Sequence, residues 1–148
     1  MKAIVDIGYR IKKIDDLLCK KADEQMQEMG VTFSQHHILV YLIHCQDHTA
    51  SLKQMEHQFC VSQATMAGIA RRMEEKKVIS SFTLPDDRRV KMVRLTDKGI
   101  DICEKSRKLM EKSEMKMRSL YSVEEMAAFD KYLDRLLDTL MGKENENV

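Results

Sequence analysis

The chain has 148 residues, of which 33% are charged and 5% aromatic, with one proline and no tryptophan. This profile predicts one mostly helical domain, long enough to bury a core. No apolar run approaches the ~18 residues that a membrane-spanning helix needs. Asp6 and Arg10 stand where a signal peptide would be apolar, so we expect a cytoplasmic protein without membrane contact.

The net charge of +1 is unevenly distributed. Residues 50–98 hold ten Lys and Arg against six Asp and Glu, a net charge of +4, whereas the rest of the chain carries −3. A basic central segment points to a polyanion such as nucleic acid. The four cysteines form no C-x-x-C pair, so we expect free thiols in a reducing compartment.

Apolar residues recur every three or four positions over residues 7–29 and predict a first helix, which Gly30 ends. Thr32–Gln35 and Ser51–Gln54 are capping boxes, and each predicts the start of a further helix. After the short connection Phe59–Val61, Ser62 predicts the cap of a fourth helix that runs to about residue 76.

The third and fourth helices, joined by three residues, predict a helix-turn-helix. The second helix of that motif presents its N-terminal turns to the base edges of the major groove. The side chains expected on this outer face are Ser62, Gln63, Ala64, Thr65, Gly68, Arg71 and Arg72. Because any helical bundle contains short helix pairs, the pair alone does not establish DNA binding.

Residues 78–84 and 91–95 have the composition of two strands and predict a β-hairpin. In the first strand we expect Val78, Ser80, Phe82 and Leu84 on one face, and in the second Val93 and Leu95. Arg88, Arg89 and Lys91 lie at the tip, which suits either a polyanion or a solvated loop. A helix pair followed by a basic hairpin is a winged helix-turn-helix, and this order favours the polyanion.

Thr96 predicts the cap of a long helix to about Leu120, and the capping box Ser122–Glu125 starts a last helix before Gly142. The apolar stripes of the terminal helices are too long for a small winged unit to cover, which predicts a two-fold dimer. We therefore expect a mostly helical α+β fold. Its parts are dimerisation helices at 1–30 and 100–141, a winged helix-turn-helix at 31–99 and a polar tail at 142–148.

The hairpin carries the pattern Asp87-x-Arg89-x-x-x-Val93-x-Leu95-Thr96-x-x-Gly99. It matches the wing signature of the MarR family of bacterial transcriptional regulators at every defined position, so the chain resembles that family over nearly its whole length. Further matches are Thr32–Gln35, Ser62 with Thr65, and Arg72-Met73-Glu74.

The resemblance implies a homodimer that binds a pseudo-palindromic operator in double-stranded DNA and regulates transcription. The sequence has no nucleophile–base pattern, Gly-rich phosphate loop or metal-ligand spacing, so we expect neither an enzyme nor a cofactor. The resemblance also implies that Asp87 braces the wing through Arg89, and that Arg88, Arg89 and Lys91 reach phosphates or the minor groove. The chain departs from the family pattern at Gly68, Lys77 and Ser81, where the family often has Arg, Gly and Arg.

The resemblance further implies a repressor that a small organic or phenolic effector releases. Twelve methionines suit an adaptable apolar pocket, although methionines at helical spacing are more often core. A thiol switch at Cys19 is an alternative, because Lys20 and Lys21 could lower its pKa. Cys45, Cys60 and Cys103 lie beside apolar positions and are expected to be structural.

A metal sensor and a protein-binding adaptor are two further interpretations of this sequence. A metal sensor is disfavoured because adjacent His36 and His37 point about 100° apart on a helix and residues 96–120 contain no histidine. A dimeric adaptor without DNA binding is favoured by Gly68 and Ser81 but opposed by the basic side chains around the winged unit.

Overall fold

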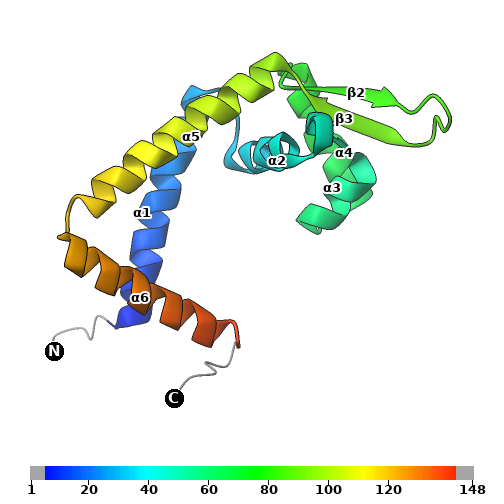
Figure 1. Cartoon of the computed structure of the whole chain (residues 1–148). Coiled ribbons are helices and arrows are strands. Elements are labelled where there is room, and N and C mark those ends of the chain that lie inside the picture. Colours follow the sequence, from blue (N-terminus) through cyan, green and yellow to red (C-terminus); the bar gives the residue numbers. More distant parts are fainter. Residues whose placement is uncertain (1–5, 143–148) are drawn as a thin grey trace. The chain divides into compact units, whose positions relative to one another are not determined.

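The computed structural model describes residues 6–142, which fall into two compact units divided between residues 107 and 108. The elements of the first unit are α1 (Ile7–Glu28), α2 (Phe33–His44), the 3-10 turn η1 (Gln46–His48), β1 (Thr49–Ser51), α3 (Leu52–Phe59), α4 (Gln63–Glu75), β2 (Ile79–Thr83), β3 (Lys91–Leu95) and the first half of α5 (Asp97–Arg118) (Figure 1). The second unit holds the rest of α5 and α6 (Val123–Leu140). Residues 1–5 and most of the predicted polar tail, 143–148, lie outside the described residues. Within 6–142 no helix has the length and apolar character to cross a membrane.

Side-chain caps determine where most of the helices begin. The hydroxyls of Thr32, Ser51, Ser62 and Ser122 each accept a hydrogen bond from the backbone N–H three residues later. At Thr32, Ser51 and Ser122 the Gln or Glu at that later position also accepts a bond from the backbone of the cap, which completes the capping box. The predicted helix starts are therefore confirmed, because each depends on local chemistry.

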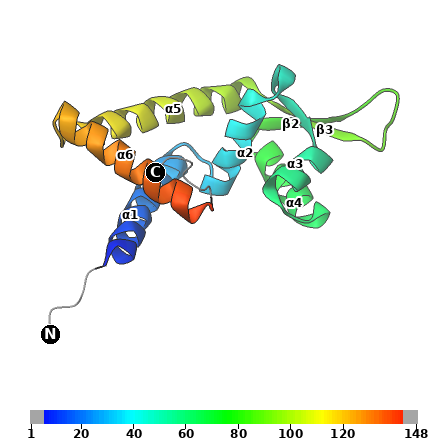
Figure 2. The same ribbon diagram turned by 60° about the horizontal axis from the view of Figure 1, so that its bottom comes forward.

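The sheet has three antiparallel strands in the order β1-β3-β2, one more than the predicted hairpin. The β2–β3 hairpin is confirmed, and the two strands run side by side beyond the helices before the loop that joins them (Figure 2). Residues Thr49–Ser51 pair with Met92–Arg94 and form the additional strand. Three residues are too few for alternation to predict a strand.

The expectation that Val78 shares one strand face with Ser80, Phe82 and Leu84 is wrong at Val78. Ile79 is buried at 1% exposure, and Ser81 pairs with buried Val93, whereas Phe82 pairs with Met92 on the opposite face. Val78 is buried but lies before the strand, in a turn where its N–H donates to the carbonyl of Met73. The alternation of the strand therefore begins one residue later than its composition implies.

The core of the first unit joins α2, α3, α4 and the inner face of the sheet. Its fully buried large side chains are Leu39, Leu42, Met55, Met66, Met73, Val78, Ile79 and Val93. Met55, Met66 and Met73 are each 0% exposed, so these methionines are core residues. The turn between α3 and α4 depends on Cys60 in the left-handed region, with φ 51°. Cys60 is exposed, which corrects its expected packing role; its importance lies in the backbone.

Candidate nucleic-acid interface

The N-terminal turn of α4 is ordered by its own side chains. The Ser62 hydroxyl accepts a hydrogen bond from the Thr65 N–H at 3.2 Å and donates to the Thr65 hydroxyl at 2.8 Å. Ser62, Gln63, Ala64 and Thr65 are all exposed, and Gly68, one turn later, is half-buried. The side chains expected to face DNA therefore share an exposed helix start whose polar groups are already oriented.

Two arginines follow on the same helix, and their surroundings differ. Arg71 forms an ion pair with Glu75, with an Nη1–Oε1 distance of 3.1 Å, and both side chains are largely exposed. Arg72 is exposed and has no ion-pair or hydrogen-bond partner among residues 6–142. Because an exposed ion pair contributes little to stability, either guanidinium can bind a DNA phosphate at a small cost in free energy.

The wing tip contains the brace that the resemblance implied. The Asp87 carboxylate accepts hydrogen bonds from the Arg89 backbone N–H at 3.0 Å and from its Nε at 3.2 Å. The Arg89 side chain is 93% exposed, so its terminal nitrogens point to solvent. Arg88 and Lys91 are also exposed, and the described residues offer neither of them an acidic partner. The loop and the start of β3 thus present three cations, one of which is bonded to Asp87.

A direct contact joins α4 to the wing. The Glu74 carboxylate accepts the backbone N–H of Ser81 at 3.2 Å and its hydroxyl at 3.3 Å. Ser81 occupies the position where the family often has Arg, and here it serves as the wing's attachment to the helix. A two-point contact of this kind fixes the angle between α4 and β2.

Arg94 is a polar residue of this region that the sequence pattern does not single out. Its Nε donates to the Thr49 hydroxyl at 3.0 Å, and its guanidinium lies 5.0 Å from the centre of the Phe82 ring. These contacts fall on the outer face of the sheet, where Arg94 pairs with both Thr49 and Ser80. The sequence does not predict this arrangement because it depends on β1. That strand is too short for an alternating pattern to reveal it.

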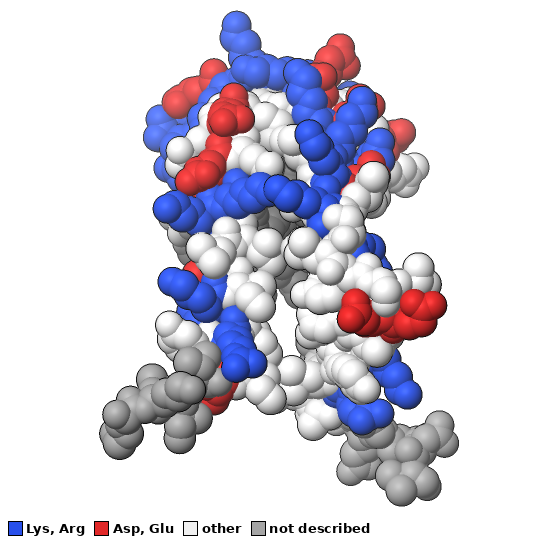
Figure 3. Space-filling view, turned by 90° about the vertical axis from the view of Figure 1, so that its left-hand side faces the viewer, with Lys and Arg blue, Asp and Glu red and all other residues white. Residues whose placement is uncertain are grey.

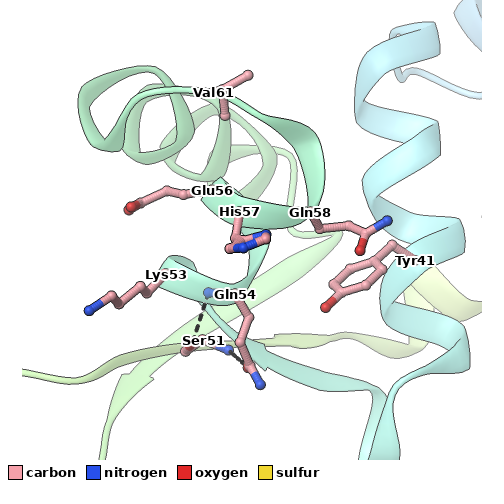
Figure 4. A pocket seen from close by; sticks show the side chains of 8 residues that line it. All are labelled: Tyr41, Ser51, Lys53, Gln54, Glu56, His57, Gln58 and Val61. Atoms are coloured by element: carbon pink, nitrogen blue, oxygen red, sulfur yellow. Dashed lines mark hydrogen bonds between the residues drawn. The ribbon is translucent and has the colours of Figure 1, made fainter.

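Three shallow depressions adjoin Tyr41 of α2. The largest, about 660 Å³, lies between α2 and α3, with Ser51 and Gln54 bonded to each other beside it (Figure 4). A second, about 500 Å³, runs over the outer sheet face and is lined in part by Phe82, Met92 and Arg94. The third, about 380 Å³, is lined by residues of α2 and α3. All three lie within the first unit.

The surroundings of Cys19 contradict the expectation of a lowered pKa. Partial desolvation and the nearby Asp15 carboxylate, which accepts a hydrogen bond from the thiol at an Sγ–Oδ1 distance of 3.6 Å, raise the pKa of Cys19. Burial raises the pKa of the Cys103 thiol to about 11. Neither environment favours a thiolate, the nucleophilic form. Within residues 6–142 no three His, Cys, Asp or Glu side chains are grouped to hold a metal ion.

Charges of both signs are interspersed on the face shown in Figure 3, where Lys and Arg side chains lie among Asp and Glu. The exposed cations on α4 and at the wing tip, described above, are the groups available to attract a polyanion.

The sequence model of the MarR family matches residues 31–91, from the residue before the α2 cap to the start of β3. This chain therefore resembles the MarR family, as expected from its wing signature. Its predicted α+β winged helix-turn-helix fold is confirmed by solved MarR-family structures. A mutant of MepR from Staphylococcus aureus aligns with a TM-score of 0.84 and 25% identity, over 91% of this chain and 98% of that one.

Two further comparisons bear on function. A structure of Staphylococcus aureus MepR in complex with DNA aligns with a TM-score of 0.69 and 25% identity, over 90% of this chain and 98% of that one. YdgJ of Bacillus subtilis, described as an uncharacterized HTH-type transcriptional regulator, is 26% identical over 119 residues. That match covers 80% of this chain and 66% of YdgJ, slightly under two thirds of its length. Regulation of transcription is thus the role given to YdgJ, and DNA is the molecule bound to MepR in that structure.

Proposed function

We propose that this protein binds a pseudo-palindromic operator in double-stranded DNA as a homodimer and represses transcription until a small organic effector releases it. The observation that carries the proposal is the pairing of two exposed surfaces, the start of α4 and the wing tip. The bonds between Glu74, near the end of α4, and Ser81 in β2 join the two elements that carry these surfaces. The likeness to DNA-bound MepR supports the same use of this geometry.

In this proposal the two surfaces have different roles. Gln63 and Thr65, at the exposed start of α4, select the sequence by contacting base edges in the major groove. Arg88, Arg89 and Lys91 contribute affinity and register through phosphates or a narrow minor groove. Arg71 and Arg72, further along α4, add backbone contacts.

The homodimer is supported by apolar side chains that a single chain leaves in solvent. On α1, Ile7 is 70% exposed and Ile14 56%, and on α6 Leu137 is 57% exposed. A soluble monomer rarely leaves such stripes uncovered, and a second copy can bury them symmetrically. Sedimentation equilibrium tests this: we expect a dimer for the native chain and a weaker one for Ile14→Glu. A monomeric native chain would contradict the proposal.

For the effector we propose the depression over the outer face of the sheet. Its volume of about 500 Å³ suits a small organic molecule. Phe82 and Met92 supply apolar contact there, and the Arg94 guanidinium supplies one directed polar group. Arg94→Met would weaken release of the operator by an effector found in a screen. An unchanged response would place the effector elsewhere.

The DNA-binding proposal is tested by titrating the purified protein against its own upstream DNA at several salt concentrations, with an unrelated duplex as the control. We expect tighter binding to the upstream duplex. Its affinity should fall steeply as the salt concentration rises, because each phosphate contact releases counterions. Weak and equal binding to both duplexes would instead favour a dimeric adaptor that binds another protein.

A further inference from the structure

The C-terminal end of α4 is bonded to the N-terminal end of α2. The Lys76 ammonium donates a hydrogen bond to the side-chain oxygen of Gln35 at 2.8 Å. The same oxygen accepts the backbone N–H of Thr32 at 3.2 Å as part of the capping box. One buried oxygen therefore serves both the cap of α2 and the end of the proposed recognition helix.

The hydrogen bond between Lys76 and Gln35 is made to a buried side chain, which increases the cost of losing it. Gln35 is only 4% exposed, so its oxygen cannot turn to water for a replacement partner. Leaving such a buried acceptor with one donor fewer is costly, and a charged donor makes a stronger bond than a neutral one. The 2.8 Å bond to Lys76 thus differs from the exposed ion pairs elsewhere on the surface.

The turn that follows α4 is also held from its other side. The Lys76 carbonyl accepts a hydrogen bond from the Lys98 ammonium at 2.9 Å, and the Lys77 carbonyl accepts one from the Thr96 hydroxyl at 2.6 Å. Lys77 itself has φ 60°, a left-handed conformation that is costly for a residue with a side chain. The surrounding bonds from α2 and from the start of α5 stabilise this turn.

Thr32 lies two residues after Gly30, where the chain leaves α1. The path from the end of α1 to the end of α4 therefore runs through the Thr32 backbone, the Gln35 side chain and the Lys76 side chain. Every member of this path lies within the first unit. No member lies on the DNA-facing start of α4.

We propose that Lys76 is a positioning residue for DNA binding: through Gln35 it fixes the recognition helix to the α1–α2 junction. This inference rests on the proposed DNA-binding function and adds how α4 is held at the angle that the operator requires. Lys76 acts through Gln35 and touches neither bases nor phosphates. A displacement at the end of α1 is passed along this path to α4.

The test compares Lys76→Met with Lys77→Met, which removes the same charge one residue later without breaking the Gln35 bond. We expect Lys76→Met to weaken operator binding by about threefold to tenfold, in the range of side chains coupled through one network. The salt dependence stays unchanged, because no phosphate contact is lost. Lys77→Met leaves the affinity near that of the native chain.

Substitutions of Gln35 provide a second test. Gln35→Glu keeps an acceptor for both Thr32 and Lys76 and retains native binding, whereas Gln35→Met weakens it. If Lys76 acts through Gln35, the double variant Gln35→Met with Lys76→Met binds no more weakly than Gln35→Met alone. Additive losses, or a salt slope lower by about one phosphate for Lys76→Met, would instead make Lys76 a direct DNA contact and overturn the inference.

Hydrogen exchange provides a readout without DNA. Lys76→Met should speed exchange of the amides at 76–78, which close the end of α4 on the carbonyls of Arg72, Glu74 and Met73. Unchanged protection in this variant would overturn the inference whether or not DNA binds. If the native protein binds no duplex but Lys76→Met still speeds exchange, the proposed DNA-binding function is contradicted. The Lys76–Gln35 link between α4 and α2 is then still supported.

Discussion

The Nε2 atom of His36 in α2 lies 2.7 Å from the hydroxyl oxygen of Ser106 in α5. The Ser106 hydroxyl also donates to the Cys103 carbonyl at 2.9 Å, and with that donor assigned its oxygen accepts from a His36 ring protonated on Nε2. The buried Nδ1 of His36 has no partner among the described residues. The ring fits this site as a neutral imidazole.

The free energy of unfolding should depend on pH through His36. Burial, with a smaller effect from His37, lowers the pKa of His36 below its ordinary value of 6.5. Because the unfolded chain then binds the proton more readily, stability is greatest above pH 6.5 and is lost as the pH falls from 6.5 through the folded pKa. Urea unfolding between pH 7.5 and 5 measures this loss. It should shrink in His36→Gln and persist in His57→Gln, an exposed control; equal slopes in all three proteins would refute the assignment.

Two glycines should respond oppositely to alanine. A Cβ on Gly99 would lie 2.2 Å from the carbonyl oxygen of Val78, a backbone atom that cannot move aside cheaply. We expect Gly99→Ala to destabilise the protein by about 1–3 kcal/mol. A Cβ on Gly68 meets nothing nearer than 3.8 Å, so Gly68→Ala should stabilise α4 by up to about 1 kcal/mol. Thermal unfolding of the two variants measures both effects, and a stable Gly99→Ala would show that the α5 start can shift.

Arg89→Ala should weaken binding to every duplex alike. The Arg89 side chain is 93% exposed and is aimed by Asp87, so the substitution removes a phosphate or minor-groove contact without disturbing the core. The slope of log affinity against log salt should fall by about one contact. Arg10→Ala on α1 serves as a control of equal charge. An Arg89→Ala protein with native affinity and slope would remove this side chain from the interface.

Gln63→Ala and Thr65→Ala should change which operator is preferred. Both side chains are exposed at the start of α4, where base edges are read. Each lost base contact should cost about 1–3 kcal/mol on the preferred operator and much less on others. Competition among operators with single base changes measures the preference. A uniform loss over all operators would show that these residues contact only the DNA backbone.

Cys19 should react with alkylating agents more slowly than an unperturbed cysteine. Desolvation and Asp15 raise its thiol pKa, which lowers the thiolate fraction near neutral pH. Asp15→Asn removes the neighbouring charge and should speed the reaction. Timed iodoacetamide labelling, followed by mass spectrometry, measures both rates. A fast reaction in the native chain would restore a thiol switch at Cys19.

Most of the helices could be predicted because their starting signals are local. Thr32 with Gln35, and Ser122 with Glu125, define capping boxes within four residues, and the structure forms both. The strand 91–95 was also predicted correctly, since Val93 and Leu95 alternate with polar neighbours and are both buried. Where the decisive contacts lie within one turn or one strand, sequence was sufficient.

The parts that could not be predicted depend on distant contacts. The strand at Thr49–Ser51 exists because of its partner Met92–Arg94, more than forty positions away. The Gln35–Lys76 hydrogen bond spans 41 residues, and no local sequence pattern predicts it. The pKa of Cys19 was predicted in the wrong direction because adjacent lysines in the sequence suggest a lowered value, whereas Asp15, one helical turn earlier, is the charge that contacts the thiol.

Glu74 also affects the free edge of the sheet at β2. β2 is an edge strand, paired with β3 on one side only, and an edge with free N–H groups can recruit a strand from another molecule. The carboxylate covers the N–H of Ser81 in the middle of that edge and adds a negative charge beside it. The β2 edge therefore has one free N–H fewer to offer a strand of another molecule.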